Sequence, residues 1–103
     1  MDIKELATRS KAIRERYHEF EINQDGQPWN VKQDALSFLT DAGLVGRKVM
    51  DQTGSWPDSN EDVSFDYKIA ESIWWLASIA DNQNINLEEA LDDFLTEREQ
   101  HLK

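Results

Sequence analysis

The segment from Phe65 to Ala80, FDYKIAESIWWLASIA, is the longest apolar stretch in this chain of 103 residues. On a helix, at 100° per residue, its apolar side chains fall on one broad stripe and on a second, nearly opposite line. The broad stripe consists of Phe65, Ile69, Ser72, Ile73, Leu76, Ile79 and Ala80, and the opposite line of Tyr67, Ala70 and Trp74. A helix that is apolar on two sides must be covered on two sides, so we expect the fold to be built around it.

A third line of the same helix carries polar side chains. Lys68, Glu71 and Trp75 are spaced i, i+3 and i+7, which places them above one another on one face. Lys68 and Glu71 are the two charges of this segment that we expect to lie deep in the fold. The line is therefore where we expect any chemistry of the chain to take place.

Three further segments have helical periodicity, and each begins with a capping pattern. We predict them from Asp2 to about Glu21, from Asn30 to about Gln52, and from Asn86 to about Leu102. The capping pairs are Asp2 with Glu5, Asn30 with Gln33, and Asn86 with Glu89. Turn-forming residues predict loops at Asn23–Pro28 and Thr53–Asn60, with Ser59 or Asn60 capping the third helix and Asp81–Asn84 ending it. The sequence thus predicts an all-α, four-helix bundle forming a single domain over residues 1–103.

The faces of these helices differ in composition. The 30–52 segment has a core stripe of Val31, Ala35, Phe38, Ala42, Val45 and Val49. Gly43 and Gly46 interrupt it, each at a cost of about 1 kcal/mol relative to alanine, and we interpret them as a patch for close helix approach. The 86–102 segment is apolar at Leu87, Ala90, Leu91, Phe94, Leu95 and Leu102 and is otherwise strongly acidic. We expect the many bases of the first helix to form a solvated outer face.

Charge and composition exclude several classes of function. Residues 1–50 carry eight acids and eight bases, whereas residues 51–103 carry thirteen acids and three bases, which gives a net charge of −10. Such a surface repels nucleic-acid phosphates, so we expect no nucleic-acid partner. The chain has no cysteine, its N-terminal residues are charged, and its apolar runs are short. We therefore expect no disulfide, no secretory signal and no membrane span, and a cytoplasmic location.

Carboxylates on the second and third helices are the remaining candidates for a functional site. Asp41 and Glu71 are the inward candidates for Mg²⁺, a hard ion that takes oxygen ligands, and Asp34 and Asp66 are weaker ones. Lys68 argues against a metal ion, because an ammonium group one turn from Glu71 would repel it. Trp29 precedes a helix cap, where it can act either as a hydrophobic staple or as a platform for a nucleobase.

Two stretches of the C-terminal half match a known pattern. Ile73-Trp74-Trp75-Leu76 is followed, after a gap, by Ile85-Asn86-Leu87-Glu88-Glu89-Ala90-Leu91. This arrangement resembles the MazG-like nucleoside triphosphate pyrophosphohydrolases. The resemblance implies an all-α, at least dimeric protein that uses Mg²⁺ to cleave a nucleoside triphosphate to the monophosphate and pyrophosphate.

The acidic motifs of that family are incomplete in this chain. The EExxE motif falls on Thr40, Asp41 and Leu44, and the ExxD motif falls on Lys68 and Glu71. Only Asp41 and Glu71 remain acidic, and Lys68 reverses the charge at its position. The resemblance therefore brings only two of five acidic positions to this chain.

Two hypotheses for the function follow from the resemblance. In the first, the chain is a divergent pyrophosphohydrolase with Asp41 and Glu71 as metal ligands, Lys68 as a third catalytic candidate, and nucleotide contacts from Trp29, Lys48 and Trp75. In the second, the Lys68 ammonium has taken the place of the cation. The chain is then a non-catalytic homodimer, or dimer of dimers, that binds a nucleotide or a protein partner. An acidic mimic of nucleic acid is a third class, which rests on charge alone.

The position of Trp74 leaves two alternatives open in the sequence. The Trp74 side of the third helix is one candidate for a face buried between subunits. Alternatively, Trp74 packs inside its own subunit beneath Gly43 and Gly46.

Overall fold

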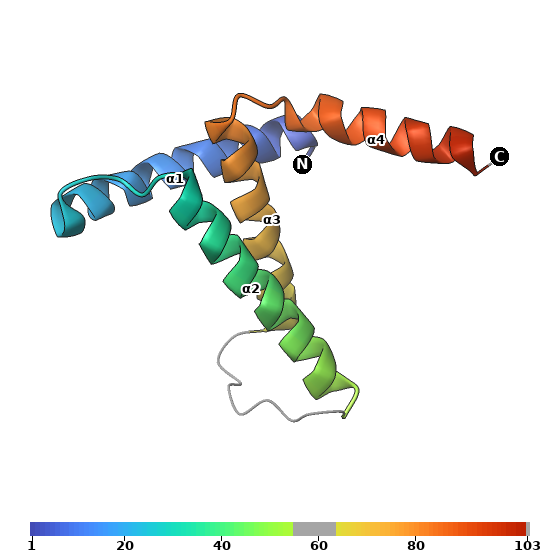
Figure 1. The fold of residues 1–103 in the computed structure, drawn as a ribbon, viewed down its shortest axis with the longest axis horizontal. Coiled ribbons are helices and arrows are strands. Elements are labelled where there is room, and N and C mark those ends of the chain that lie inside the picture. Colours follow the sequence, from blue (N-terminus) through green and yellow to red (C-terminus); the bar gives the residue numbers. More distant parts are fainter. Residues whose placement is uncertain (55–63, 103) are drawn as a thin grey trace. The chain divides into compact units, whose positions relative to one another are not determined.

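The computed structural model describes residues 1–54 and 64–102, and within these ranges all regular structure is helical. The helices are α1 (Ile3–Asp25), α2 (Val31–Gln52), α3 (Phe65–Asn82) and α4 (Leu87–His101), as Figure 1 shows. The prediction of an all-α chain is confirmed, whereas its arrangement as a bundle and its self-association stay predictions. No helix in the described ranges has the length and apolar character needed to cross a membrane.

The chain separates into two compact units, which are described one at a time. The first unit joins Met1–Pro28 to Ala77–Lys103 and therefore holds α1, the end of α3, and α4. The second unit is Trp29–Leu76, which holds α2 and most of α3. A single domain over residues 1–103 requires the two units to pack together, and it stays a prediction.

The helix α1 begins where its capping residue predicts but ends later than expected. The Asp2 carboxylate accepts a hydrogen bond of 2.7 Å from the Glu5 N–H. The helix continues past Glu21 to Asp25 and stops at Gly26, whose φ of 83° is left-handed and suits glycine. The Gly26 N–H donates to the Ile22 carbonyl, so the glycine, rather than the polar residues before it, ends the helix.

The other helix starts are also fixed by side chains. Asn30 and Gln33 form the complete predicted capping box at the start of α2, and the Asn86 side chain accepts from the Glu89 N–H at the start of α4. At the start of α3 the Ser64 hydroxyl accepts from the Tyr67 N–H at 3.1 Å. The caps that we expected at Ser59 or Asn60 lie outside the described residues.

A tight turn separates α3 from α4. Asn84 has a φ of 57°, a left-handed conformation that asparagine tolerates better than most residues. The Ile85 N–H donates to the Ala80 carbonyl at 2.8 Å, which satisfies a carbonyl group at the end of α3. The predicted end of the third helix in the Asp81–Asn84 segment is therefore confirmed.

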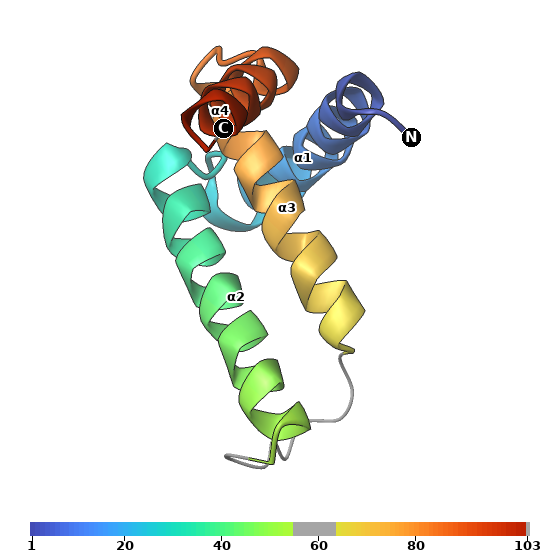
Figure 2. The ribbon, with the colours of Figure 1, turned by 90° about the vertical axis from the view of Figure 1, so that its right-hand side faces the viewer.

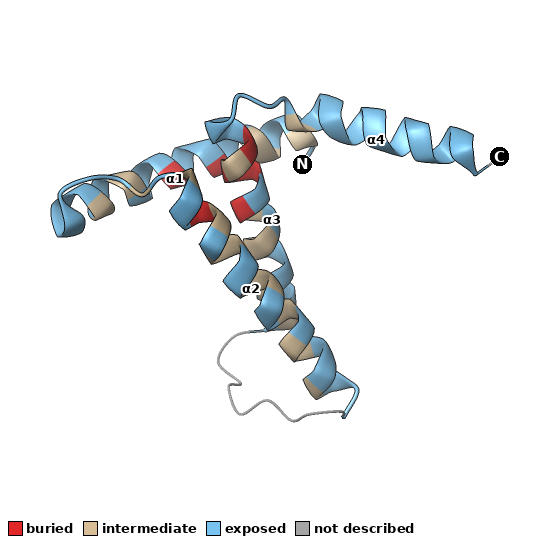
Figure 3. Cartoon of the chain, viewed as in Figure 1, coloured by how far each residue is buried: buried red, intermediate tan, exposed pale blue. Residues whose placement is uncertain are grey.

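In the first unit, small residues of α1 and α3 are buried, and α1 carries one largely buried ion pair along its own length. Ser10 and Arg14 of α1, and Ala77, Ser78 and Ala80 of α3, are all below a tenth exposed (Figure 3). The Arg14 guanidinium donates to both oxygens of Glu21, at 2.7 and 3.4 Å, and the two side chains are 6% and 11% exposed. The expectation that all bases of α1 form a solvated face is therefore wrong for Arg14. Its spacing of two turns from Glu21 places both charges on one buried line.

In the second unit α2 and the N-terminal part of α3 lie side by side (Figure 2). The predicted core stripe of α2 is half-buried from Val31 to Val45, but Val49 is exposed. On α3 the outcome differs from the prediction, because Ile69, Ile73 and Leu76 are 41%, 44% and 45% exposed. Instead, Lys68 and Trp75 of the third line hydrogen-bond to Asp41 of α2.

Among the described residues of the second unit, the glycines of α2 do not serve a close helix contact. A Cβ atom built on Gly43 or Gly46 would meet no described atom within 4 Å. Within that part of the chain the interpretation of a close helix approach is therefore wrong, and so is the placement of Trp74 beneath these glycines. The alternative, a face on the Trp74 side between subunits, stays a prediction.

Candidate functional site

Two helices of the second unit bring the predicted acidic residues together. Asp41 lies in the middle of α2, and Lys68 and Glu71 lie in the first two turns of α3. Trp75 follows Glu71 by one turn on the same face. We name these four residues the Asp41–Lys68 cluster.

The Lys68 ammonium group bridges the two carboxylates. Its Nζ atom donates to Asp41 Oδ1 at 3.2 Å and to Glu71 Oε1 at 2.9 Å. The Lys68 and Asp41 side chains are each 14% exposed, and the Glu71 side chain is 25% exposed. Largely shielded from water, these charges interact more strongly than a surface pair would.

Trp75 completes the cluster through a hydrogen bond that the sequence did not reveal. Its indole Nε1–H donates to Asp41 Oδ2 at 2.7 Å, and the residue is 8% exposed. Each Asp41 oxygen therefore accepts a hydrogen bond from a different side chain of α3. The sequence placed Trp75 on the same helical line as Lys68 and Glu71 and predicted chemistry along that line, but it did not identify Asp41 as the partner of the indole.

The pKa of Lys68 reflects this environment. The hydrogen bond to Glu71, and then the hydrogen bond and negative charge of Asp41, raise the pKa of Lys68 above its ordinary value of 10.5, although burial of the ammonium opposes the shift. The lysine is therefore firmly protonated at neutral pH. The cluster holds a fixed positive charge between two carboxylates.

The cluster does not fit Mg²⁺. The ion needs about six oxygen ligands at close to 2.1 Å, and its second positive charge would lie beside a bound ammonium group. One oxygen of Asp41 and one of Glu71 already face Lys68, and the other Asp41 oxygen faces Trp75. In the described ranges no group of three or more acidic, histidine or cysteine side chains is placed to hold a metal ion.

The other residues predicted to form the functional site lie elsewhere along the helices of the second unit. Lys48 is half-buried and lies two helical turns, or about 10 Å along the axis, beyond Asp41. Trp29 is half-buried and precedes the other end of α2. Asp34 is buried at 3% exposure, and Asp66 is exposed. Only Asp41, Lys68, Glu71 and Trp75 are joined by the hydrogen bonds given above, and the nucleotide contacts of Trp29, Lys48 and Trp75 stay predictions.

The neighbouring tryptophans form a pair beside the cluster. The ring centroids of Trp74 and Trp75 are 4.7 Å apart and the ring planes are inclined by 45°. Trp74 is half-buried, whereas Trp75 is buried against α2 by its hydrogen bond to Asp41. The pair therefore joins an interior ring to a ring nearer the surface.

Comparison of the chain with protein-family models, with curated protein sequences and with solved structures found no match. The resemblance to MazG-like pyrophosphohydrolases thus rests on the sequence motifs alone and stays a prediction.

Proposed function

We propose that this chain is a non-catalytic, MazG-like helical protein that acts by association, as a homodimer that binds a protein partner. In this proposal the Asp41–Lys68 cluster is a structural ion-pair site. It stabilises the packing of α2 against α3 where the MazG-like enzymes hold a metal ion. The chain consequently does not hydrolyse nucleoside triphosphates.

The observation that carries the proposal is the double contact of Lys68. Phosphoryl transfer requires positive charge that is free to bind the phosphate oxygens of the substrate. The Lys68 ammonium is instead used by Asp41 and Glu71, at 3.2 and 2.9 Å. Neither carboxylate is then suited to bind a cation, because each already faces one.

Exposed apolar side chains support a role in association. In the described ranges the buried hydrophobic residues are Trp75, Ala77 and Ala80. Large side chains such as Leu36 and Leu39 of α2 are 63% exposed. Soluble proteins seldom leave many neighbouring apolar side chains in water unless these meet a partner. The same exposure favours a protein partner over a nucleotide.

The first test is pyrophosphate release from a panel of canonical and modified nucleoside triphosphates, with Mg²⁺ or Mn²⁺. We expect no release above the level of a buffer control, from protein shown to be folded by circular dichroism. Release that is lost in both Asp41→Asn and Glu71→Gln would overturn the proposal and would favour the pyrophosphohydrolase, with Lys68 contacting phosphate.

A second test uses a change of charge at Lys68. Lys68→Glu places a third carboxylate beside Asp41 and Glu71, so we expect it to lower the melting temperature without metal and to make it respond to Mg²⁺. For a Kd of about 1 mM, 10 mM Mg²⁺ stabilises the variant by about 1.4 kcal/mol. The wild type and the matched surface variant Lys32→Glu should not respond. A Mg²⁺ response of the wild type that Asp41→Asn removes would contradict the ion-pair role.

A further inference from the structure

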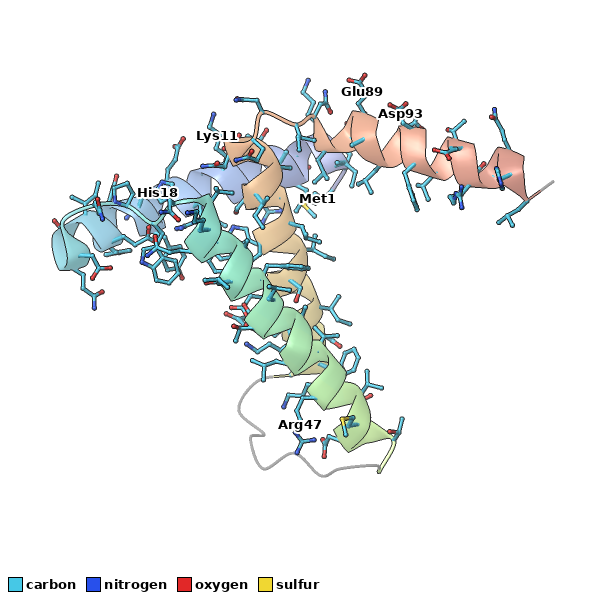
Figure 4. The ribbon with its side chains drawn as sticks, in the orientation of Figure 1. Met1, Lys11, His18, Arg47, Glu89 and Asp93 are labelled. Atoms are coloured by element: carbon cyan, nitrogen blue, oxygen red, sulfur yellow. The ribbon has the colours of Figure 1, made fainter. Side chains whose placement is uncertain are left out.

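Most of α4 presents an apolar stripe to solvent. Leu91, Phe94 and Leu95 are 38%, 58% and 53% exposed and are spaced i, i+3 and i+4, so they share one face. Figure 3 shows that α4 is exposed along most of its length, and Figure 4 shows Glu89 and Asp93 projecting together from one side of it. Helical geometry places the α4 stripe, Leu91, Phe94 and Leu95, on the opposite side.

The C-terminal half of α1 has an apolar stripe of its own. Ile13, Tyr17 and Phe20 are 47%, 50% and 60% exposed and are spaced i, i+4 and i+7. The rings of Tyr17 and Phe20 meet edge to face, with centroids 6.2 Å apart. This α1 stripe is therefore a ready-made apolar surface with an ordered aromatic pair.

Within the first unit, α4 approaches a different part of α1. A hollow of about 620 Å³ lies between them, and its α1 side is lined by Ile3, Lys4, Ala7 and Thr8. The α4 side of the hollow is formed by the beginning of the helix, as far as Asp92. From there α4 continues away from α1 (Figure 1). The α4 stripe and the α1 stripe of one chain therefore do not cover each other.

The charges beside the two stripes are complementary. Arg9 and Arg16 flank the α1 stripe seven residues apart, with side chains 65% and 74% exposed, and each also lies near a glutamate of its own helix, Glu5 at 4.0 Å and Glu19 at 3.6 Å. Asp92 and Glu99 flank the α4 stripe, are also seven residues apart, and are exposed. Equal spacing of opposite charges along two helices is the arrangement that selects helix partners at the edges of an apolar seam.

We propose that a second copy of this chain covers both stripes: α4 of each copy packs on the α1 stripe of the other. A two-fold axis makes the contact twice, so each apolar side chain contributes twice to the buried area. This assignment rests on the homodimer of the proposed function but not on the absence of catalysis. It identifies the surface through which the copies associate, and it places that surface on α1 and α4 rather than beside Trp74.

The absence of cysteine in the chain allows a direct test. Tyr17→Cys and Phe94→Cys are prepared separately, one with an affinity tag, mixed in equal amounts and oxidised mildly. We expect a covalent heterodimer that contains one copy of each variant. The matched control is Glu89→Cys, on the opposite side of α4, which should give at least tenfold less heterodimer with Tyr17→Cys. Equal yields from Phe94→Cys and Glu89→Cys would overturn the assignment.

Sedimentation velocity distinguishes a wrong assignment of the dimer surface from the absence of a dimer. We expect the wild type to be a dimer, and Phe94→Glu to raise the dimer Kd at least tenfold while keeping its helical circular dichroism. A dimer that Phe94→Glu leaves unchanged would overturn this surface but retain self-association. A wild type that stays monomeric at 100 μM would overturn both. A disulfide formed within one chain by the double variant Tyr17→Cys/Phe94→Cys, as a monomer, would show that α4 folds back onto its own α1 and would also overturn the assignment.

Discussion

Replacing Lys68 by methionine removes the ammonium group of the Asp41–Lys68 cluster and keeps a flexible side chain of similar length. Asp41 and Glu71 then face each other without the cation that bridges them at 3.2 and 2.9 Å. Asp41 keeps the hydrogen bond from Trp75, whereas Glu71 loses its contact with Lys68. The change therefore leaves two partly buried carboxylates, and the folded state should be less stable.

The size of the effect follows from the burial of the three side chains. Removing one partner from a fully buried ion pair costs about 3–5 kcal/mol, and exposed pairs contribute about 0–1 kcal/mol. The Lys68 and Asp41 side chains are 14% exposed and that of Glu71 is 25% exposed, which places the cluster nearer the buried limit. Because water still reaches the carboxylates, we expect a loss of about 2 kcal/mol, or about 10 °C in melting temperature.

The assay is urea unfolding at pH 7, followed by circular dichroism, with Lys32→Met as the matched control. Lys32 is an exposed lysine of α2, so its substitution should change the free energy of unfolding by no more than about 0.5 kcal/mol. A double-mutant cycle with Asp41→Asn then measures the coupling between Lys68 and Asp41, which should be about 1 kcal/mol or more. Lys68→Met as stable as the wild type, or zero coupling to Asp41, would refute the view that this lysine holds the two helices together.

Three further predictions concern pH, the indole contact and the glycines. Because the pKa of Lys68 is raised, its stabilising contribution is complete below about pH 10 and is lost as the pH rises through the raised pKa. In urea unfolding, the stability difference between wild type and Lys68→Met should therefore be constant from pH 7 to 10 and become smaller above pH 10. A stability difference that grows at high pH would contradict the direction of this pKa shift. Trp75→Phe removes the hydrogen-bond donor to Asp41 Oδ2 and should lower the free energy of unfolding by about 1.5 kcal/mol in the same assay. The loss should be smaller when Asp41 is already replaced by asparagine. An equal loss with either residue at position 41 would show that the effect comes from packing alone. Gly43→Ala should stabilise the chain by about 0.5–1 kcal/mol in thermal unfolding, because a Cβ atom at this helical site meets no described atom within 4 Å. Gly26→Ala should destabilise the chain by about 1 kcal/mol, because Gly26 has a left-handed φ of 83°. Destabilisation by Gly43→Ala would instead indicate a packed interface at that glycine.

Local sequence signals predicted the first residues of α1, α2 and α4. Asp2, Asn30 with Gln33, and Asn86 act through side-chain hydrogen bonds to backbone groups only two or three residues away, so the pattern along the chain is enough to identify them. The late end of α1 was missed because Gly26, rather than the polar residues before it, stops the helix. The local capping hydrogen bonds at the helix starts were therefore easier to predict than which of two neighbouring sequence features ends α1.

The candidate site was predicted in part. The spacing of Lys68 and Glu71 predicted that they share a line, and the motif position of Asp41 brought it into the same hypothesis. The hydrogen bond from Trp75 to Asp41 joins residues 34 apart in the sequence, and one chain alone gives no measure of how α2 and α3 are aligned. The buried pair of Arg14 and Glu21 was missed because opposite charges on a helix are most often solvated.

The paired indoles of Trp74 and Trp75 give the cluster an intrinsic optical signal. The two ring centroids are 4.7 Å apart and the ring planes are inclined by 45°, so the indole transitions are close enough to couple, and we expect this pair to contribute to the circular dichroism spectrum. Trp75 is held by its hydrogen bond to the Asp41 carboxylate, so we expect loss of that contact to change the contribution of the pair. The state of the cluster can thus be followed without labels, in the same cuvette in which unfolding is measured.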